Sequence, residues 1–73
     1  MPLSALPPGA RARVVALEGG YGSMRRLMEM GLTPGALVEV VRNGPGPIIL
    51  RVRGTMIALG RGLASKIIVE PVG

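Results

Sequence analysis

Glycine and proline divide this chain into short pieces. They account for twelve and seven of its 73 residues, and turn signals recur about every 8 to 12 residues. This spacing disfavours long helices, because proline removes a helical hydrogen bond and glycine weakens a helix interior. It is typical of small all-β domains built from short strands. Since so short a chain buries enough surface for only one core, we expect a single domain over residues 1–73.

Several of the pieces carry the apolar pattern of strands. Residues 48–53 place Ile48, Leu50 and Val52 on one face of a strand and Ile49, Arg51 and Arg53 on the other. This period of two predicts a half-buried strand with Arg51 and Arg53 facing solvent. Residues 43–47 are expected to form a hairpin tip, because their prolines cannot continue a strand ladder. The five expected strands are residues 11–18, 37–42, 48–53, 56–59 and 67–70. Closing such strands into a partly open barrel would remove most of the exposed sheet edges.

One segment between the first two strands predicts a short helix. Residues 24–30 contain good helix formers, and Ser23 is expected to cap them by accepting a hydrogen bond from a backbone amide. Gly31 stands where a left-handed residue ends many helices, and Leu32 would make the accompanying apolar contact. A single further helical turn is expected at residues 63–66. The expected fold is therefore all-β, with one short helix inserted.

The faces of this helix differ in character. Arg25 and Glu29 are four residues apart, so we expect them to pair on the solvent side. Leu27 is expected to pack into the core together with Met30. Met24 and Met28 allow two interpretations, since methionines at helical spacing fill cores but also serve on surfaces that bind partners.

The residue types that perform most enzyme chemistry are missing. The chain contains no His, Cys or Asp, so its hydroxyl and amine groups have no conventional partner to activate them. Its four acidic residues are Glu18, Glu29, Glu39 and Glu70. They have no local ligand spacing, and Fe(II) sites are built mainly from imidazole, carboxylate or thiolate. The sequence therefore predicts a protein that is not an enzyme and that has neither a resident metal site nor a cofactor.

The apolar runs bear on where the protein resides. None approaches the roughly 18 consecutive residues that a membrane-spanning helix requires. The first residues lack the charged start and apolar stretch of a secretory signal, and nothing indicates an oxidising compartment. We expect a cytoplasmic protein.

Residues 19–35 read GGYGSMRRLMEMGLTPG, and with their flanking signals they resemble the FeoA family of ferrous iron transport proteins. The residues that match the family pattern occur in the same order and extend over almost the whole chain. They match at Leu3, Leu6, Pro8, Gly9, Arg26, Leu27, Met30 to Leu32, Pro34, Gly35, Val38 to Val40, Val52 to Gly54 and Ile57 to Leu59. The hairpin at residues 43–47 is shorter than the family's usual loop, and Leu63-Ala64 stands where Glu-Ala is common.

The resemblance implies a small SH3-like β-barrel of about five strands with one short inserted α-helix. It also implies a non-catalytic cytosolic accessory of ferrous iron uptake that binds and modulates FeoB, a membrane transporter with a cytosolic GTP-binding domain. By the same resemblance, we expect that partner to recruit the protein to the inner face of the membrane. The resemblance also implies weak self-association and the transition-metal binding associated with the family.

The predicted helix is the best candidate for a docking surface. It would present adaptable methionines between charged side chains, with a tyrosine beside them as an aromatic anchor. The hypothetical partner-binding residues are Tyr21, Met24, Arg25, Arg26, Met28 and Glu29.

A nucleic-acid-binding barrel is the main alternative. Nine Lys and Arg residues against four acids give a net charge of +5, and basic barrels bind nucleic acids through phosphate contacts. Tyr21 is the only aromatic residue, however, and the arginines are scattered along the chain, which disfavours this function. A stand-alone relative of the C-terminal SH3-like domain of iron-dependent repressors is a related alternative. A chain of this length has no room for the helix-turn-helix domain that accompanies those domains.

Overall fold

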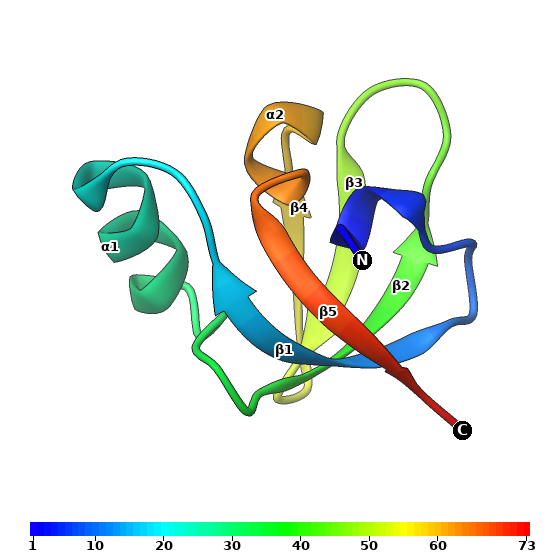
Figure 1. Cartoon of the computed structure of the whole chain (residues 1–73). Coiled ribbons are helices and arrows are strands. Elements are labelled where there is room, and N and C mark those ends of the chain that lie inside the picture. The colour runs from blue at the N-terminus through cyan, green and yellow to red at the C-terminus, as the bar shows by residue number, and fades with distance from the viewer.

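The five strands form one antiparallel sheet that curls round a single core. The computed structural model describes all 73 residues. The elements are a 3-10 turn η1 (Leu3–Ala5), β1 (Arg11–Leu17), α1 (Tyr21–Glu29), β2 (Leu37–Arg42), β3 (Ile48–Val52), β4 (Thr55–Leu59), α2 (Arg61–Ala64) and β5 (Ile67–Val72). The strand order is β4-β3-β2-β1-β5, and the two end strands do not pair with each other. The fold is thus an all-β, partly open barrel, from which α1 projects on one side (Figure 1).

The core is built from the inward side of each strand. Every second residue of β1 and β3 is buried over part of the strand, as the alternation of apolar and polar residues requires. Fifteen residues are buried, all of them apolar. They are Leu3, Leu6, Ala12, Val14, Leu27, Leu32, Val38, Val40, Ile48, Leu50, Val52, Leu59, Ala64, Ile67 and Val69. The barrel is held by hydrophobic packing, with no charged or polar residue fully buried among these side chains.

The N-terminal segment closes one side of the sheet. The Met1 amino group donates a hydrogen bond of 3.0 Å to the Val69 carbonyl, and the Val69 amide donates one of 2.7 Å to the Met1 carbonyl. Pro2 forms an isolated bridge with Ile68, and Leu3 is completely buried. The free edge of β5 is therefore partly covered by the first residues of the chain.

Several element boundaries differ from the sequence prediction, beginning with β1, which ends at Leu17, and β4, which begins at Thr55. The third strand ends at Val52, because Arg53 lies in the β3–β4 turn with a φ of 52°. The second helical turn spans Arg61–Ala64 rather than 63–66. β5 continues through Pro71 to Val72, since a proline is tolerated in a strand near the sheet edge. Neither α-helix has the length or the apolar character needed to cross a membrane.

Asn43 links three segments of the chain through hydrogen bonds of its side chain. Its Nδ2 donates hydrogen bonds to the Ser4 carbonyl at 3.1 Å and to the Leu6 carbonyl at 2.7 Å. Arg61 Nη1 donates to Asn43 Oδ1 and to the Gly44 carbonyl, both at 2.9 Å. One amide side chain thus joins the N-terminal segment, the β2–β3 loop and α2.

Replacing Asn43 with alanine is expected to lower the free energy of unfolding by about 1–3 kcal/mol, because two partly buried carbonyls lose their donor. Urea unfolding followed by circular dichroism measures this loss. The control is Arg61→Met, which removes only exposed hydrogen bonds to the same loop and should cost less than about 1 kcal/mol. Equal stability of Asn43→Ala and the parent protein would contradict the linking role of Asn43.

Candidate functional site

Helix α1 begins directly after a sharp glycine turn. Gly19 has a φ of 103°, and Gly20 occupies the N-cap position in an extended conformation. The Met24 amide donates to the Gly20 carbonyl at 3.1 Å, so the helix starts at Tyr21. The prediction that Ser23 caps the helix is therefore wrong, because Ser23 lies within its first turn and no side chain caps the N-terminus. The left-handed glycine lets the chain turn earlier than a serine cap would require.

The helix ends in the predicted glycine motif. Gly31 has a φ of 91°, its amide donates to the Met28 carbonyl, and the Leu32 amide donates to the Leu27 carbonyl, both at 3.0 Å. This pair of hydrogen bonds is the Schellman arrangement. Leu27 and Leu32 are both completely buried. The end of the helix is thus fixed to the barrel.

Leu27 is the only residue of α1 that is fully buried. Met30, just after the helix, is partly buried and packs against the core, as predicted. The rest of the helix surface faces outward or is half-buried. A single leucine and the turn behind it therefore hold a helix whose outer face is free of contacts with the core.

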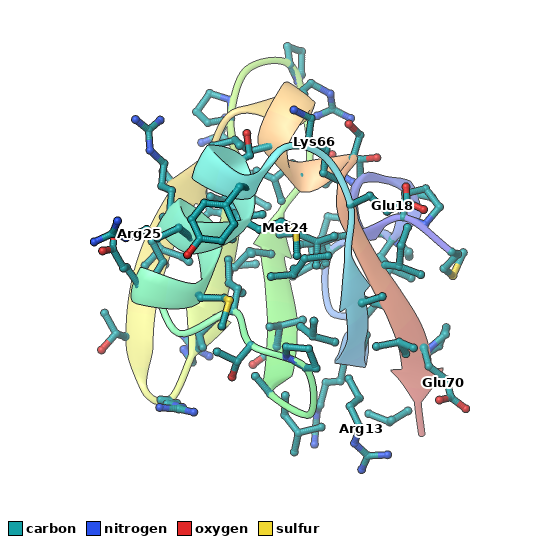
Figure 2. All side chains as sticks on the ribbon, turned by 60° about the vertical axis from the view of Figure 1, so that its left-hand side comes forward. Arg13, Glu18, Met24, Arg25, Lys66 and Glu70 are labelled. Atoms are coloured by element: carbon teal, nitrogen blue, oxygen red, sulfur yellow. The ribbon has the colours of Figure 1, made fainter.

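A shallow groove of about 390 Å³ lies along this outer face. It is lined by Tyr21, Met24, Arg25, Met28, Glu29 and Thr33. Tyr21 is 81% exposed and Met28 is 48% exposed, so both of these large side chains are open to solvent. Figure 2 shows Arg25 projecting away from the barrel at the outer side of the helix. The groove thus combines an aromatic ring, two thioethers and a pair of opposite charges.

The charges of the groove are only weakly engaged. Arg25 Nε lies 3.6 Å from Glu29 Oε2, as the four-residue spacing predicts. Both side chains are largely exposed, so this ion pair adds little to stability. A binding partner could therefore compete for either charge.

The structure brings together five of the six predicted partner-binding residues in this groove. Arg26 is exposed on the same helix but does not line the groove. Thr33 is an additional lining residue that the sequence analysis did not identify. It opens the turn in which the Ala36 amide donates to the Thr33 carbonyl at 3.0 Å, and that turn brings it back beside the helix. The turn itself was recognisable from Thr33-Pro34-Gly35, but its place at the groove was not.

The exposure of Met24 and Met28 decides between core packing and a place on the surface. Met24 is half-buried and Met28 is exposed, and both line the groove rather than filling the core. Elsewhere in the molecule, no group of three or more His, Cys, Asp or Glu side chains is placed to hold a metal ion.

Comparison with known proteins identifies the fold and the family. Residues 1–71 match the family model described as the FeoA domain. A protein of Methanocaldococcus jannaschii named "Putative Fe(2+) transport protein A" is 44% identical over 69 residues, covering 94% of this chain and 84% of that protein. A crystal structure of the iron uptake regulatory protein FeoA superposes with a TM-score of 0.94 at 42% identity, covering 99% of this chain and 97% of the other.

A FeoA of Stenotrophomonas maltophilia, solved in complex with zinc, is described as a procaryotic SH3 domain protein. It is 32% identical, with a TM-score of 0.84, and the match covers 96% of this chain and 89% of the other. A manganese-dependent transcriptional repressor shares the fold at a TM-score of 0.92 but is only 20% identical, and the match covers 36% of its chain. The SH3-like barrel is therefore confirmed, and the chain belongs to the FeoA family.

Proposed function

We propose that this protein is a non-catalytic cytosolic accessory of ferrous iron uptake that docks, through the α1 groove, onto the GTP-binding domain of a FeoB-type membrane transporter. The observation that carries the proposal is the exposed groove with Tyr21 and Met28 on a helix anchored by one buried leucine. Family membership supplies the link to ferrous iron transport. The absence of His, Cys and Asp favours an effect exerted by contact with another macromolecule.

The groove is suited chemically to a protein surface. Methionine side chains adapt to irregular apolar contours, and tyrosine provides a large anchor that loses little rotamer entropy on binding. Arg25 and Glu29 at the margin can orient a partner by pairing with opposite charges. Binding there would bias the assembly or the nucleotide-linked cycle of the transporter, because a ligand shifts an equilibrium when it prefers one of its states.

The test is an amide chemical-shift titration of the isotope-labelled protein with the soluble GTP-binding domain. We expect the largest shifts in residues 21–33, with the strands beyond β1 little changed. Shifts centred on another face would contradict the α1 groove, and no binding to any cytosolic part of the transporter would contradict the proposed function.

A parallel titration with duplex DNA distinguishes docking onto the transporter from the alternative function, nucleic-acid binding. Phosphate binding weakens steeply between about 50 and 200 mM salt, whereas docking through apolar side chains weakens much less. We expect no saturable shifts with DNA. Saturable binding that disappears with added salt would instead favour the nucleic-acid function.

A further inference from the structure

Four arginines share the outer surface of the sheet, away from the α1 groove. The strand register aligns Arg11 of β1 with Glu39 of β2, and Glu39 with Arg51 of β3. Arg13 lies two residues along β1 from Arg11, and Arg53 lies in the turn that follows β3. We call this surface, formed by Arg11, Arg13, Arg51 and Arg53 with the apolar side chains Leu37 and Met56, the arginine face.

The arginine face is open and contains exposed apolar side chains. A shallow depression of about 270 Å³ is lined by residues that include Arg11, Leu37, Arg51 and Arg53. Leu37 is 57% exposed, and Met56, which is aligned with Arg51, is 52% exposed. Cationic and apolar side chains therefore share the outer surface of four neighbouring strands, with Glu39 between Arg11 and Arg51.

Four arginines stand against Glu39 and Glu70 on this side of the sheet, so a net positive charge remains there. Glu39 is the only acidic residue in the depression, and its Oε1 already accepts a hydrogen bond from Arg51 Nη1 at 3.2 Å. Glu70 is aligned with Arg13 across β1 and β5, but the two side chains form no ion pair. Arg11 and Arg53 likewise form no ion pair.

Arg53 occupies a backbone position that arginine rarely takes. It is the only non-glycine residue with a positive φ, and with Gly54 it forms a two-residue hairpin turn between Val52 and Thr55. Turns with two positive φ values favour Asn-Gly, because asparagine adopts the left-handed conformation more readily than a long side chain does. The Arg53 side chain nevertheless helps to line the depression.

We propose that the arginine face binds the anionic surface of a phospholipid bilayer. Guanidinium groups pair with phosphate oxygens in a bidentate geometry, and the exposed Leu37 and Met56 can enter the boundary between headgroups and acyl chains. Neither a nucleic acid nor a uniformly acidic peptide would give these two apolar side chains a favourable environment. The breadth of the face, spread over several strands, also matches a planar surface better than a single peptide side chain.

The position of the face leaves the α1 groove accessible. Arg13 and Arg25 project from different sides of the barrel in Figure 2. A molecule resting on a bilayer through its sheet could therefore present α1 sideways to a membrane-embedded partner. Lipid binding does not depend on the identity of that partner.

The test measures sedimentation of the full chain with two kinds of vesicle, one of phosphatidylcholine alone and one containing phosphatidylglycerol. We expect binding only to the anionic vesicles, and weaker binding as salt is added. The double variant Arg11→Gln, Arg53→Asn should bind about fivefold more weakly for each charge removed. Arg53→Asn creates the favoured Asn-Gly turn, and Arg11 is exposed, so the thermal midpoint of the double variant should not fall below that of the parent protein. A loss of vesicle binding in the double variant is then not due to unfolding.

The control is the double variant Arg25→Gln, Arg26→Gln, which removes the same charge from α1 and should bind anionic vesicles as the parent does. An equal loss in both double variants would overturn the proposal, because the attraction would then depend only on net charge. Failure to sediment with either vesicle would overturn it too. If a poly-glutamate peptide then bound the protein in a salt-sensitive way, the face would be assigned to an acidic protein instead.

Discussion

Replacing Leu27 with alanine should lower the free energy of unfolding by about 2–5 kcal/mol. The side chain is completely buried, and it is the only residue of α1 inserted into the core. Its carbonyl also accepts the Leu32 amide at the end of the helix, so a cavity there would weaken both packing and the terminal turn. Typical stabilities of about 0.05–0.15 kcal/mol per residue leave a chain of this size little reserve. Chemical unfolding followed by circular dichroism measures the loss.

The control for this prediction is the same substitution at an exposed leucine. Leu37→Ala removes the same atoms from a side chain that is 57% exposed, and it should change stability by no more than about 0.5 kcal/mol. Hydrogen exchange adds a second measurement, because the amides of α1 should lose protection before those of the sheet in Leu27→Ala. A loss no greater than that of Leu37→Ala would show that α1 is not anchored by Leu27.

Replacing Met28 with aspartate should weaken binding to the GTP-binding domain by about 30-fold or more, the effect typical of an interface hot spot. The thioether lies in the α1 groove, and a carboxylate there would have to lose its water on docking. The fold should be unaffected, because Met28 is 48% exposed and contributes nothing to the buried core. Isothermal titration calorimetry with the soluble domain measures the change.

Met56→Asp is the matched control, since Met56 is 52% exposed but lies on β4 outside the α1 groove. It should bind the GTP-binding domain as the parent protein does. Arg26→Glu should have a smaller effect than Met28→Asp, because Arg26 is on the same helix but beyond the groove. Unchanged binding by Met28→Asp would remove this surface as the docking site.

Local patterns were sufficient to predict most of the barrel. Alternation in residues 48–53 identified β3 and the solvent-facing Arg51, and the Gly31-Leu32 pair identified the end of α1. The start of α1 was missed because Ser23 is a good capping residue, while the glycines before it allow an earlier turn. The capping preference of Ser23 alone did not reveal whether the helix begins after Ser23 or after Gly20.

Local sequence patterns could not predict contacts between residues that are far apart in the chain. The hydrogen bond between the Met1 amino group and the Val69 carbonyl joins residues 68 positions apart, and no local signal marks it. The contacts of Asn43 with the N-terminal segment are of the same kind. In the candidate site, helical spacing placed Met24 and Met28 near Leu27, but only the position of the barrel wall decides which of them is exposed. Thr33 enters the groove for the same reason, through the packing of a turn against a helix.

The attachment of α1 through one leucine has an evolutionary consequence. Exposed positions of a helix tolerate substitution at little cost in stability, so the outer residues of α1 can diverge while Leu27 and the Gly31 turn preserve the scaffold. Partner preference can then change between lineages without a new fold having to arise. Differences between related chains would then gather on the outer positions of α1, whereas the buried residues of the barrel would change slowly.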